Sequence, residues 1–401
     1  MLSGGVDIRR GTFEWMKSVN RSIILNRIRT DSPISRAQIA KDTKLTPPTV
    51  SSNVKALIEQ GIVIESVLGE SQGGRKPTML LINNKAFYVI GVDVGPKVID
   101  YVIADLAGNI VTRGSNKLTM PITNTGFLTI LKEGVHTLIA ETSIDLEKVI
   151  GIGVAMHGVV EVETGTSLFA TNLSLTNIPI KEALEKEFEL EVKVENDARA
   201  MALGESWFGN HGELDSMLAV NLGRGVGAGL IINGKVYHGA QDISGEVGHM
   251  TIDINGEICE CGNRGCLQTF ATGSAITKQA EKVLKELAIT DFDDTPITGE
   301  IVYEMALAGN QDFVKILEDT GAIIGIGLTN LIHIINPSKI ILGGGVTKSG
   351  KFILPAVHKS IEQRALTPRA KQTEVTLSEL GDDATIIGAI ALLLVDLFDP
   401  L

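Results

Sequence analysis

Apolar residues recur at helical spacing in three short segments of the first sixty residues. The first segment covers residues 15–29. The second begins at Ser35, and Gln38 three residues later completes a capping-box pattern. The third begins at Thr46, which can cap a helix, and Pro47 follows at the first helical position, where a missing N–H does no harm. Two short helices that meet at a tight turn predict a helix-turn-helix.

A strand-like hairpin follows these helices at residues 62–82. Its loop, residues 69–77, is rich in glycine and carries Arg75 and Lys76. Basic side chains on such a loop can neutralise phosphates or enter a minor groove. The order of elements therefore predicts a winged helix-turn-helix DNA-binding domain over residues 1–85.

Small polar side chains are concentrated at the start of the third predicted helix. They can reach base edges and phosphates without steric conflict. The predicted DNA contacts are Thr46, Pro47, Thr49, Ser51, Ser52 and Asn53, together with Arg75 and Lys76 of the loop. A generic helical bundle with a solvated basic face is the alternative. Agreement between the caps, the order of elements and the basic loop favours DNA binding.

From residue 86 onward, buried strands alternate with helices, and one arrangement occurs twice. An apolar strand at residues 89–95 ends in a glycine turn and is followed by a second strand. The same succession returns at residues 217–232, around a second glycine turn. This repetition predicts two similar α/β lobes that face a cleft, and the cleft would be the ligand site.

The predicted fold class is therefore α/β, with two lobes behind the DNA-binding domain. The first lobe comprises residues 86–200 and is joined by the C-terminal helix, residues 384–401. The second lobe comprises residues 201–383 and contains the cysteine-rich segment.

Charge is unevenly distributed along the chain, whose net charge is −12. Residues 1–85 carry 13 Lys and Arg and 7 Asp and Glu, a net +6, whereas the remainder carries 23 and 41, a net −18. A basic head on an acidic body is the asymmetry expected when only the head meets a polyanion. The operator partner is accordingly expected to be double-stranded DNA.

Composition and hydropathy indicate a soluble cytoplasmic protein without a membrane partner. Hydrophobic content of 44% with 43 glycines fits a globular α/β protein. The N-terminus lacks a basic-then-apolar signal segment. The longest apolar run, residues 384–395, is interrupted and too short to span a bilayer.

All three cysteines of the chain lie within eight residues, and a histidine precedes them. The thiolates of Cys259, Cys261 and Cys266 and the imidazole of His249 make a four-ligand set that suits a closed tetrahedral zinc site. A catalytic zinc is disfavoured, because four protein ligands leave no open position. The alternatives are chance clustering of core thiols or a disulfide, which would leave one cysteine over and requires an oxidising compartment.

These motifs together resemble the ROK family, which contains bacterial sugar-responsive repressors and sugar kinases. The resemblance spans nearly the whole chain and is carried by Leu222-Gly-Arg-Gly-Val-Gly-Ala-Gly229, Gly245-Glu-Val-Gly-His249 and Cys259-Glu-Cys-Gly-Asn-Arg-Gly-Cys266. It implies an actin-like, hexokinase-type (ribonuclease H-like) pair of lobes. The added helix-turn-helix is similar to that of the repressors, and within them the xylose-responsive branch of Gram-positive bacteria is most similar.

The resemblance also implies a monosaccharide site. Asn196 and Asp197 match the pair at its base, where the aspartate of a kinase would deprotonate a sugar hydroxyl. Glu246 and His249 match the same site, and His249 would hold zinc with one ring nitrogen and face a sugar hydroxyl with the other. Gln268 stands where many members have a glutamate that contacts the sugar.

Two further candidates, Asn172 and Gly158, come from loops that would border the cleft. For Asp197 the alternative role is helix capping, which its position after a strand also suits. Judged by residue type alone, capping is favoured; the neighbouring pattern favours sugar contact.

The sequence departs from the family kinases at both glycine turns. The first turn reads Asp93-Val-Gly-Pro96-Lys97 where kinases have Asp-x-Gly-Gly-Thr, and Pro96 removes an N–H that could hold a phosphate. In the second turn Arg224 replaces a threonine. Both changes disfavour ATP in the kinase pose, so no enzymatic activity is expected.

The sequence therefore predicts a sugar-responsive repressor of a carbohydrate operon, with Zn²⁺ as cofactor and xylose or a related monosaccharide as effector. It is expected to act as a homodimer or a dimer of dimers, because two-fold symmetry matches a palindromic operator. One alternative is an ATP-dependent sugar kinase with an appended DNA-binding domain. Another is a sugar sensor whose head binds a second protein.

Overall fold

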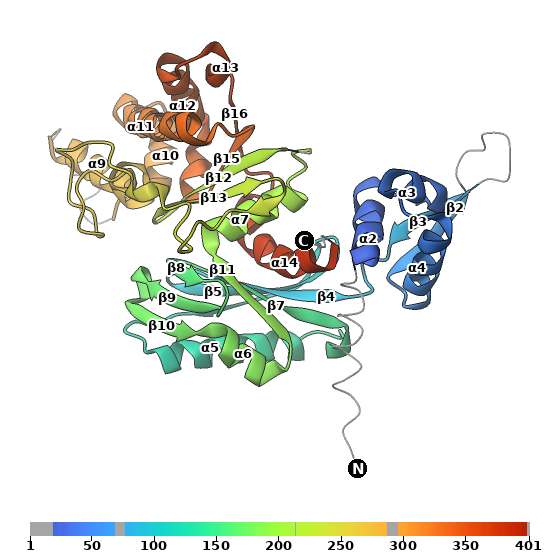
Figure 1. Ribbon diagram of the computed structural model, residues 1–401. Helices are drawn as coiled ribbons and strands as arrows, with labels where there is room; N and C mark the ends of the chain where they lie inside the picture. Colours follow the sequence, from blue (N-terminus) through green and yellow to red (C-terminus); the bar gives the residue numbers. More distant parts are fainter. Residues whose placement is uncertain (1–18, 69–76, 213, 287–295, 399–401) are drawn as a thin grey trace. The chain divides into compact units, whose positions relative to one another are not determined.

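The computed structural model describes residues 19–68, 77–212, 214–286 and 296–398 (Figure 1). The described residues group into two units. Unit 1 lies within residues 1–195 and 389–401, and unit 2 lies within residues 196–388. The three-part division at residues 85 and 200 stays a prediction.

The head of unit 1 is a winged helix-turn-helix, as predicted. Its helices are α2 (Val19–Asp31), α3 (Arg36–Thr43) and α4 (Pro47–Glu59). They pack with a small sheet of order β1-β3-β2, formed by Ile34–Ser35, Thr78–Ile82 and Val63–Leu68. The loop that carries Arg75 and Lys76 lies outside the described residues.

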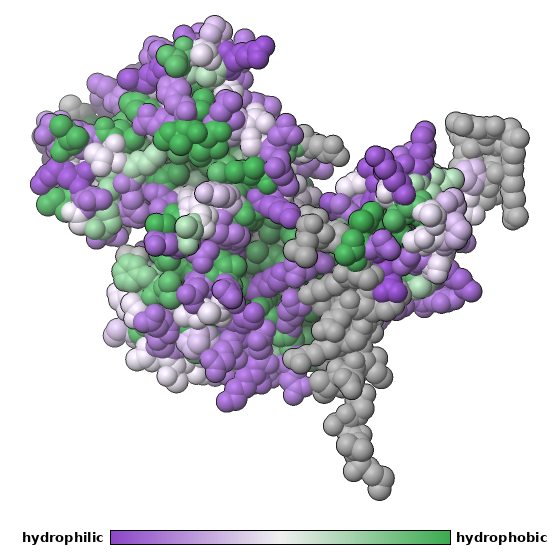
Figure 2. Space-filling model, in the orientation of Figure 1, coloured by the Kyte–Doolittle hydropathy of each residue, from purple (hydrophilic) through white to green (hydrophobic). Residues whose placement is uncertain are grey.

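Aliphatic side chains form the interior of the head. The apolar residues of the head with no exposed surface include Ile24, Leu25, Ile28, Ile39, Val50, Val54, Leu57, Ile62, Val63 and Leu80. Figure 2 shows hydrophilic residues over much of the visible surface of the head. Val19, the first residue of α2, belongs to the apolar positions of this helix by its spacing but is 60% exposed.

The predicted helix caps are present, with one correction. Ser35 accepts the N–H of Gln38 at 3.2 Å, and Thr46 accepts the N–H of Thr49 at 3.3 Å. The Gln38 side chain donates its Nε2 to Asp42 Oδ1 at 2.7 Å, and no hydrogen bond from the Ser35 N–H to the Gln38 amide oxygen is found among the described residues. Only the N-cap half of the predicted capping box is therefore observed.

The rest of unit 1 is built on a sheet of order β11-β7-β4-β5-β6. Its strands are β4 (Tyr88–Val94), β5 (Val98–Asp105), β6 (Ile110–Lys117), β7 (Val149–Met156) and β11 (Glu191–Asn196). Helices α5 (Asn124–Ala140) and α6 (Ile180–Phe188) share its hydrophobic core. A smaller sheet of order β10-β9-β8 joins this core, from strands Leu175–Pro179, Thr166–Ala170 and Val159–Glu161.

Unit 2 contains a sheet with the matching order β14-β13-β12-β15-β16. Its strands are β12 (Ser216–Leu222), β13 (Val226–Ile232), β14 (Lys235–Val236), β15 (Lys339–Gly343) and β16 (Glu374–Leu377). In both sheets the central strand pairs antiparallel with the strand after its glycine turn and parallel with its other neighbour. The predicted repetition of one α/β arrangement is confirmed.

Helices cover both faces of the unit 2 sheet. On one face lie α8 (Gln268–Ala271), α9 (Gly273–Glu286), α10 (Gly299–Leu307), α11 (Gln311–Ile335) and α12 (Gly350–Arg364), and a short α13 (Pro368–Lys371) follows α12. On the other face lies α7 (Asp197–Phe208). Successive residues of β12 alternate accordingly: Leu218 packs in the core of α11 and α12, whereas Met217 packs with Met201 of α7.

The last helix, α14 (Ala384–Phe398), belongs to both units: its residues up to 388 lie in unit 2 and the rest in unit 1. Glycines bring its backbone close to each unit. A Cβ on Gly388 would overlap the carbonyl oxygen of Ala200 in α7. A Cβ on Gly153 in β7 would overlap the carbonyl oxygen of Ala389. Among the described residues, no helix combines the length and apolar character needed to span a membrane.

We expect Gly153→Ala to lower the free energy of unfolding by about 1–3 kcal/mol or more, because the added methyl group has no space between β7 and α14. Gly299→Ala, at the start of α10 with nothing near its would-be Cβ, is the control and should be neutral or mildly stabilising. Denaturant unfolding followed by circular dichroism measures both. Equal midpoints for the two variants would contradict the expected close contact.

Candidate functional site

The four predicted metal ligands converge in unit 2. One ring nitrogen of His249 and the Sγ atoms of Cys259, Cys261 and Cys266 all lie within 4.8 Å of one another. The Cys261 and Cys266 sulfurs are 3.7 Å apart, and Cys259 Sγ is 3.8 Å from His249 Nδ1. Zn–S bonds of about 2.3 Å in a tetrahedron place ligand atoms about 3.8 Å apart. The residues therefore fit a closed zinc site.

Tight turns bring these ligands together. Cys259 donates its N–H to the carbonyl of Asn263 at 2.7 Å, which closes a turn that contains Cys261. Gly265 has φ +67°, and a Cβ there would overlap the carbonyl oxygen of Asp253. Glycine is required at that position both for the left-handed backbone and for the close approach.

Residues 250–254 alternate apolar and polar side chains, a pattern that predicts a short strand, but no strand forms there. Thr251 makes only an isolated bridge to Cys266. The N–H groups of Ile252 and Asp253 both point to the carbonyl of Gly265, at 2.8 and 3.3 Å. The Asp253 carboxylate then accepts the N–H of Asn255 at 2.9 Å and turns the chain. Convergence of the cysteines, rather than strand pairing, determines this segment.

The pKa values of two of the thiols, Cys261 and Cys266, shift in opposite directions. Burial, followed by the neighbouring Cys261 and Cys259, raises the pKa of Cys266 to about 12. In contrast, the backbone N–H of Asn263 lowers the pKa of the exposed Cys261. Without a cation Cys266 therefore holds its proton, and a metal must displace that proton to bind the thiolate.

His249 connects the metal set to the predicted sugar set. Its Nδ1 faces the sulfurs, and its Nε2 lies 3.8 Å from Oε2 of Glu246. Burial raises the pKa of Glu246, although 40% of its side chain is exposed. The Asp197 carboxylate also raises this pKa, whereas His249 and Arg199 lower it. Glu246 and His249 are therefore neighbours, and the Asp197 carboxylate lies near enough to affect the pKa of Glu246; joint contact of these groups with a sugar stays a prediction.

Asn196 and Asp197 occupy the junction of β11 and α7. Asn196 is the N-cap residue, and its Oδ1 accepts the N–H groups of Ala198 and Arg199 at 3.0 and 3.1 Å. Its Nδ2 donates to Asp197 Oδ1 at 3.0 Å. Asn196 is thus the N-cap residue. Asp197, the first helical residue, also accepts the N–H of Ala198 through Oδ1 at 2.9 Å, so this oxygen takes part in the start of the helix as well.

Arg199 is a positioning residue that the sequence analysis missed. It is 2% exposed, and its Nη1 donates to the carbonyl oxygens of Asp242 at 2.8 Å and Ser244 at 3.4 Å. These carbonyls immediately precede Glu246, so Arg199 connects α7 to the loop that carries this carboxylate. The only sequence signal was a charged residue on the buried side of an alanine-rich helix.

Gln268 contacts the metal set. Its Nε2 donates to Cys259 Sγ at 3.2 Å, and its Oε1 lies 3.8 Å from where a Cβ of Gly225 would be. Gln268 therefore spans the distance between a cysteine ligand and the second glycine turn. An amide can donate to a thiolate, whereas a glutamate carboxylate in the same place would only repel it.

The two glycine turns contain Pro96 and Arg224, the residues at which the sequence departs from the family kinases. In unit 1 the turn between β4 and β5 contains Pro96, and a Cβ on Gly95 would lie 2.8 Å from the carbonyl oxygen of Val98. In unit 2 the turn between β12 and β13 is closed by a hydrogen bond of 3.0 Å from Gly223 N–H to Gly225 O, and Arg224 is exposed.

The remaining sugar candidates lie in unit 1. Asn172 is exposed within a short 3₁₀ turn, Thr171–Leu173. Gly158 has φ +84°, and a Cβ there would overlap the carbonyl oxygen of Phe169. Contact of either residue with the unit 2 residues stays a prediction.

The predicted DNA contacts that the structure describes lie at the start of α4. Pro47, Ser51 and Ser52 are exposed. Thr46 and Thr49 hydroxyls are 2.8 Å apart, and Asn53 Nδ2 donates to the carbonyl of Thr49 at 2.8 Å. The start of α4 thus has an exposed polar surface, with some of its side chains oriented by local hydrogen bonds.

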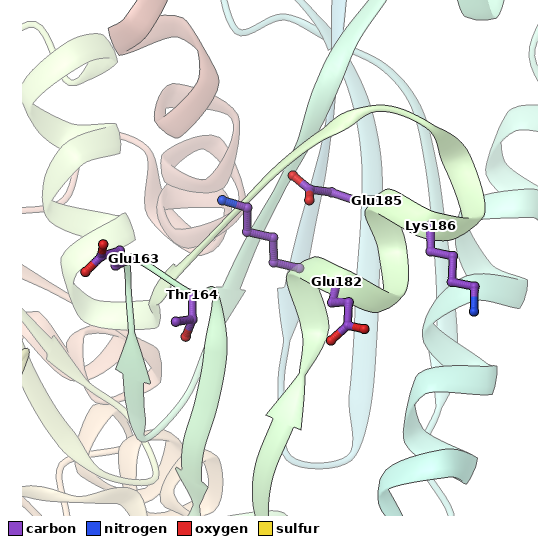
Figure 3. Close-up of a pocket in the computed structure, with 6 residues that line it drawn as sticks. Glu163, Thr164, Glu182, Glu185 and Lys186 are labelled. Atoms are coloured by element: carbon purple, nitrogen blue, oxygen red, sulfur yellow. The ribbon is translucent and has the colours of Figure 1, made fainter.

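A separate hollow of about 460 Å³ lies in unit 1 beside α6 (Figure 3). Its lining is charged and carries both signs: Glu163, Thr164, Lys181, Glu182, Glu185 and Lys186. None of the predicted sugar-binding residues is among the residues that line it.

Comparison with known proteins finds separate matches for the head and for the rest of the chain. A model of the ROK family matches residues 89–395, and a model of winged helix-turn-helix DNA-binding domains matches residues 20–64. The chain is 30% identical over 393 residues to the xylose repressor of Caldicellulosiruptor bescii, covering 96% of this chain and 98% of the relative. It is also 30% identical over 393 residues to the N-acetylglucosamine repressor of Escherichia coli O6:H1, covering 98% and 96%.

Solved structures include both regulators and kinases. A ROK family transcriptional regulator, a homolog of the E. coli MLC protein, superposes with a TM-score of 0.85 at 26% identity, covering 96% of this chain and 98% of that one. A ROK family glucokinase from Streptomyces griseus, in complex with glucose and AMPPNP, gives a TM-score of 0.68 at 29% identity and covers 76% of this chain and 98% of that one.

Zinc affinity is expected to fall as the pH is lowered, because the Cys266 thiol must lose its proton before it can bind the metal. Competition with a chromophoric chelator at several pH values measures the affinity, and a weakly buffered titration measures the released protons. Cys266→Ser should lower the affinity more than about 100-fold, since it removes a ligand outright. Glu257→Gln, an exposed change in the same segment, is the control; equal losses would refute the proposed ligand set.

Gln268→Glu is expected to weaken zinc binding about 10–100-fold, because a carboxylate replaces the donor that faces the Cys259 sulfur. Gln268→Met, which keeps the length but has no charge, should lose less. The same chelator competition ranks the three proteins. If the glutamate variant binds zinc as tightly as the wild type, the contact between Gln268 and Cys259 does not support the metal.

Proposed function

Because this chain belongs to the ROK family, we propose that it is a DNA-binding transcriptional repressor whose hold on its operator responds to a monosaccharide. The observation that carries this proposal is the presence, in one chain, of a winged helix-turn-helix with an exposed polar start of α4 and a carboxylate–imidazole cluster in unit 2. Similarity over nearly the full length to repressors supports it.

The sugar is bound by polar groups whose orientation is fixed beforehand. Asp197 and Glu246 accept hydrogen bonds from sugar hydroxyls, and Nε2 of His249 faces the same ligand. Asn196 contributes through its amide, and Gln268 completes the set that unit 2 provides. Preorganised donors and acceptors reduce the entropy lost on binding, which favours a small ligand that offers only hydroxyl groups.

Xylose is the effector that we propose first, because the similarity to xylose repressors covers almost the whole chain. The N-acetylglucosamine repressor is similar to the same extent, so a hexosamine is the comparison sugar. The glutamine at position 268 gains a donor relative to a glutamate, which alters the hydroxyl pattern that the site prefers.

DNA is bound by the head. Thr46, Thr49 and Asn53 present polar atoms at the start of α4, and the exposed Pro47, Ser51 and Ser52 complete that surface. Arg75 and Lys76 neutralise phosphates. The protein binds as a homodimer, alone or paired into a dimer of dimers, because a two-fold pair of heads matches two operator half-sites about one or two helical turns apart.

Zinc has a structural role in this proposal. His249, Cys259, Cys261 and Cys266 would hold it, and its closed coordination would hold the segment next to Glu246 in place. It supplies no reaction chemistry there.

An ATP-dependent sugar kinase is the second candidate, favoured by the likeness to a glucokinase and by the retained Asp197. Phosphoryl transfer depends on backbone N–H groups and small side chains around the phosphates. Pro96 removes one such N–H, and Arg224 places a bulky side chain in the second turn. A coupled ADP-release assay over a panel of sugars separates the two functions: turnover supports the kinase.

Operator binding is expected to weaken steeply as salt increases, and to change by about 5–150-fold when xylose is added. Fluorescence anisotropy of a labelled operator, titrated with xylose, glucose and N-acetylglucosamine in turn, measures both effects. Asp197→Asn should lose the sugar effect but bind DNA normally without sugar, whereas Ser52→Arg should alter DNA binding alone.

If the operator affinity does not change with salt concentration, the head binds another protein instead of DNA. A salt-dependent operator complex that none of the sugars alters would remove the proposed effector class.

A further inference from the structure

A buried carboxylate–imidazole pair lies in unit 2, separate from the predicted metal and sugar residues. The side chain of Glu205, in the last turns of α7, has no exposed surface. Its Oε2 lies 2.7 Å from Nε2 of His211, whose side chain is 4% exposed. A carboxylate and an imidazole at this depth are retained only where the surrounding structure satisfies both.

The other carboxylate oxygen of Glu205 holds a distant part of the chain. Glu205 Oε1 accepts the hydroxyl of Ser378, which is 173 residues away in the sequence. It also accepts the backbone N–H of Leu380 at 3.3 Å. Ser378 Oγ in turn accepts the N–H of Gly381 at 2.8 Å. One carboxylate thus connects α7, the loop that follows it and the segment at residues 378–381.

The segment at residues 378–381 leads directly into α14, which begins at Ala384. Close backbone packing reinforces the connection. A Cβ on Gly204 would lie 2.7 Å from the carbonyl oxygen of Ala384, and a Cβ on Gly388 would overlap that of Ala200. The first turn of α14 and the middle of α7 therefore pack at backbone distance, with Glu205 holding the adjoining segment.

Both elements that Glu205 connects continue into unit 1 through the peptide chain. Helix α7 begins at Asp197, directly after the point where the chain leaves unit 1, and α14 re-enters unit 1 after residue 388. Helix α7 also begins with the Asn196–Asp197 pair to which the proposed function assigns the sugar. The effector end of α7 and the carboxylate that holds α14 are thus parts of one rigid helix.

We propose that Glu205, with His211 and Ser378, is a positioning residue that makes α7 and the start of α14 move together when the sugar binds at Asn196 and Asp197. This inference rests on the proposed function. A buried, fully hydrogen-bonded carboxylate resists separation of its partners, because each one left alone would be an uncompensated polar group in the interior. A displacement of α7 is therefore passed to α14 rather than absorbed in the loop at residues 378–381.

The proposal separates sugar affinity from the response to sugar. Glu205 is remote along α7 from the residues assigned to the sugar, so weakening its contacts should leave the sugar affinity within about threefold of wild type. The coupling between sugar and operator should fall instead, because coupling depends on two sites biasing the same element. A merely structural role would lower the melting temperature and leave the coupling ratio unchanged.

Ser378→Ala and His211→Asn are the test variants in the full-length protein, since each removes one partner and leaves the Glu205 carboxylate in place. His136→Asn is the matched control: His136 Nε2 and Glu187 Oε1 are 2.9 Å apart in a similar pair, but the His136 side chain is 56% exposed. Xylose affinity is measured by calorimetry. The coupling ratio is the operator dissociation constant with saturating xylose divided by that without it, on a duplex selected by the wild-type protein.

We expect both test variants to bind xylose with unchanged affinity while their coupling ratio falls at least about fivefold toward one, and the control to match wild type. A folded variant that keeps the wild-type ratio overturns the proposal, as does loss of xylose affinity without loss of coupling. If the wild-type protein responds to no sugar, the proposed function fails first and the inference fails with it.

Hydrogen exchange on the wild-type protein provides a test that does not depend on any variant folding. Xylose should slow exchange of the Leu380 and Gly381 amides, which belong to the connected segment, together with amides in α7. Xylose-dependent protection confined to the start of α7, with the 378–381 amides unaffected, overturns the proposal.

Discussion

The imidazole of His249 is the group on which the candidate site depends. One ring nitrogen lies among three sulfurs and the other faces the carboxylate of Glu246. A ring held from both sides cannot rotate without disturbing both sets. The backbone around it is equally constrained, because the carbonyl of Gly245 accepts the N–H of Ala228 at 2.8 Å and a Cβ on Gly248 would overlap the carbonyl of Val226. The glycines of this motif let it lie directly against β13.

Local signals in the sequence predicted most helices and the convergence of the metal ligands, because caps, periodicity and close cysteine spacing act over a few residues. Helix α12 escaped prediction since Pro355 lies inside it. The strand expected at residues 250–254 was wrong because the chain there turns to bring cysteines together. Arg199 and Glu205 could not be predicted, because their partners lie 43 and 173 residues away and periodicity carries no information about such pairs.

The residues at the start of α7 show how one side chain can serve both fold and ligand. Asn196 uses its amide oxygen to cap the helix and its nitrogen to orient Asp197. The aspartate is therefore held in position by the same interactions that begin the helix. Burial raises the pKa of the nearby Glu246, and Arg199 opposes this from within α7. Helix α7 thus holds the Asp197 carboxylate in position and, through Arg199, lowers the pKa of Glu246.

The assignment of helices to sheets has a consequence for biosynthesis. Helix α7 follows the last strand of the unit 1 sheet but covers the sheet of unit 2, whereas α14 follows the last strand of unit 2 and supplies its later residues to unit 1. The strand β7 that receives α14 is made long before that helix leaves the ribosome. The nascent first half therefore emerges with one sheet face uncovered, and its folding can finish only after α14 has been synthesised.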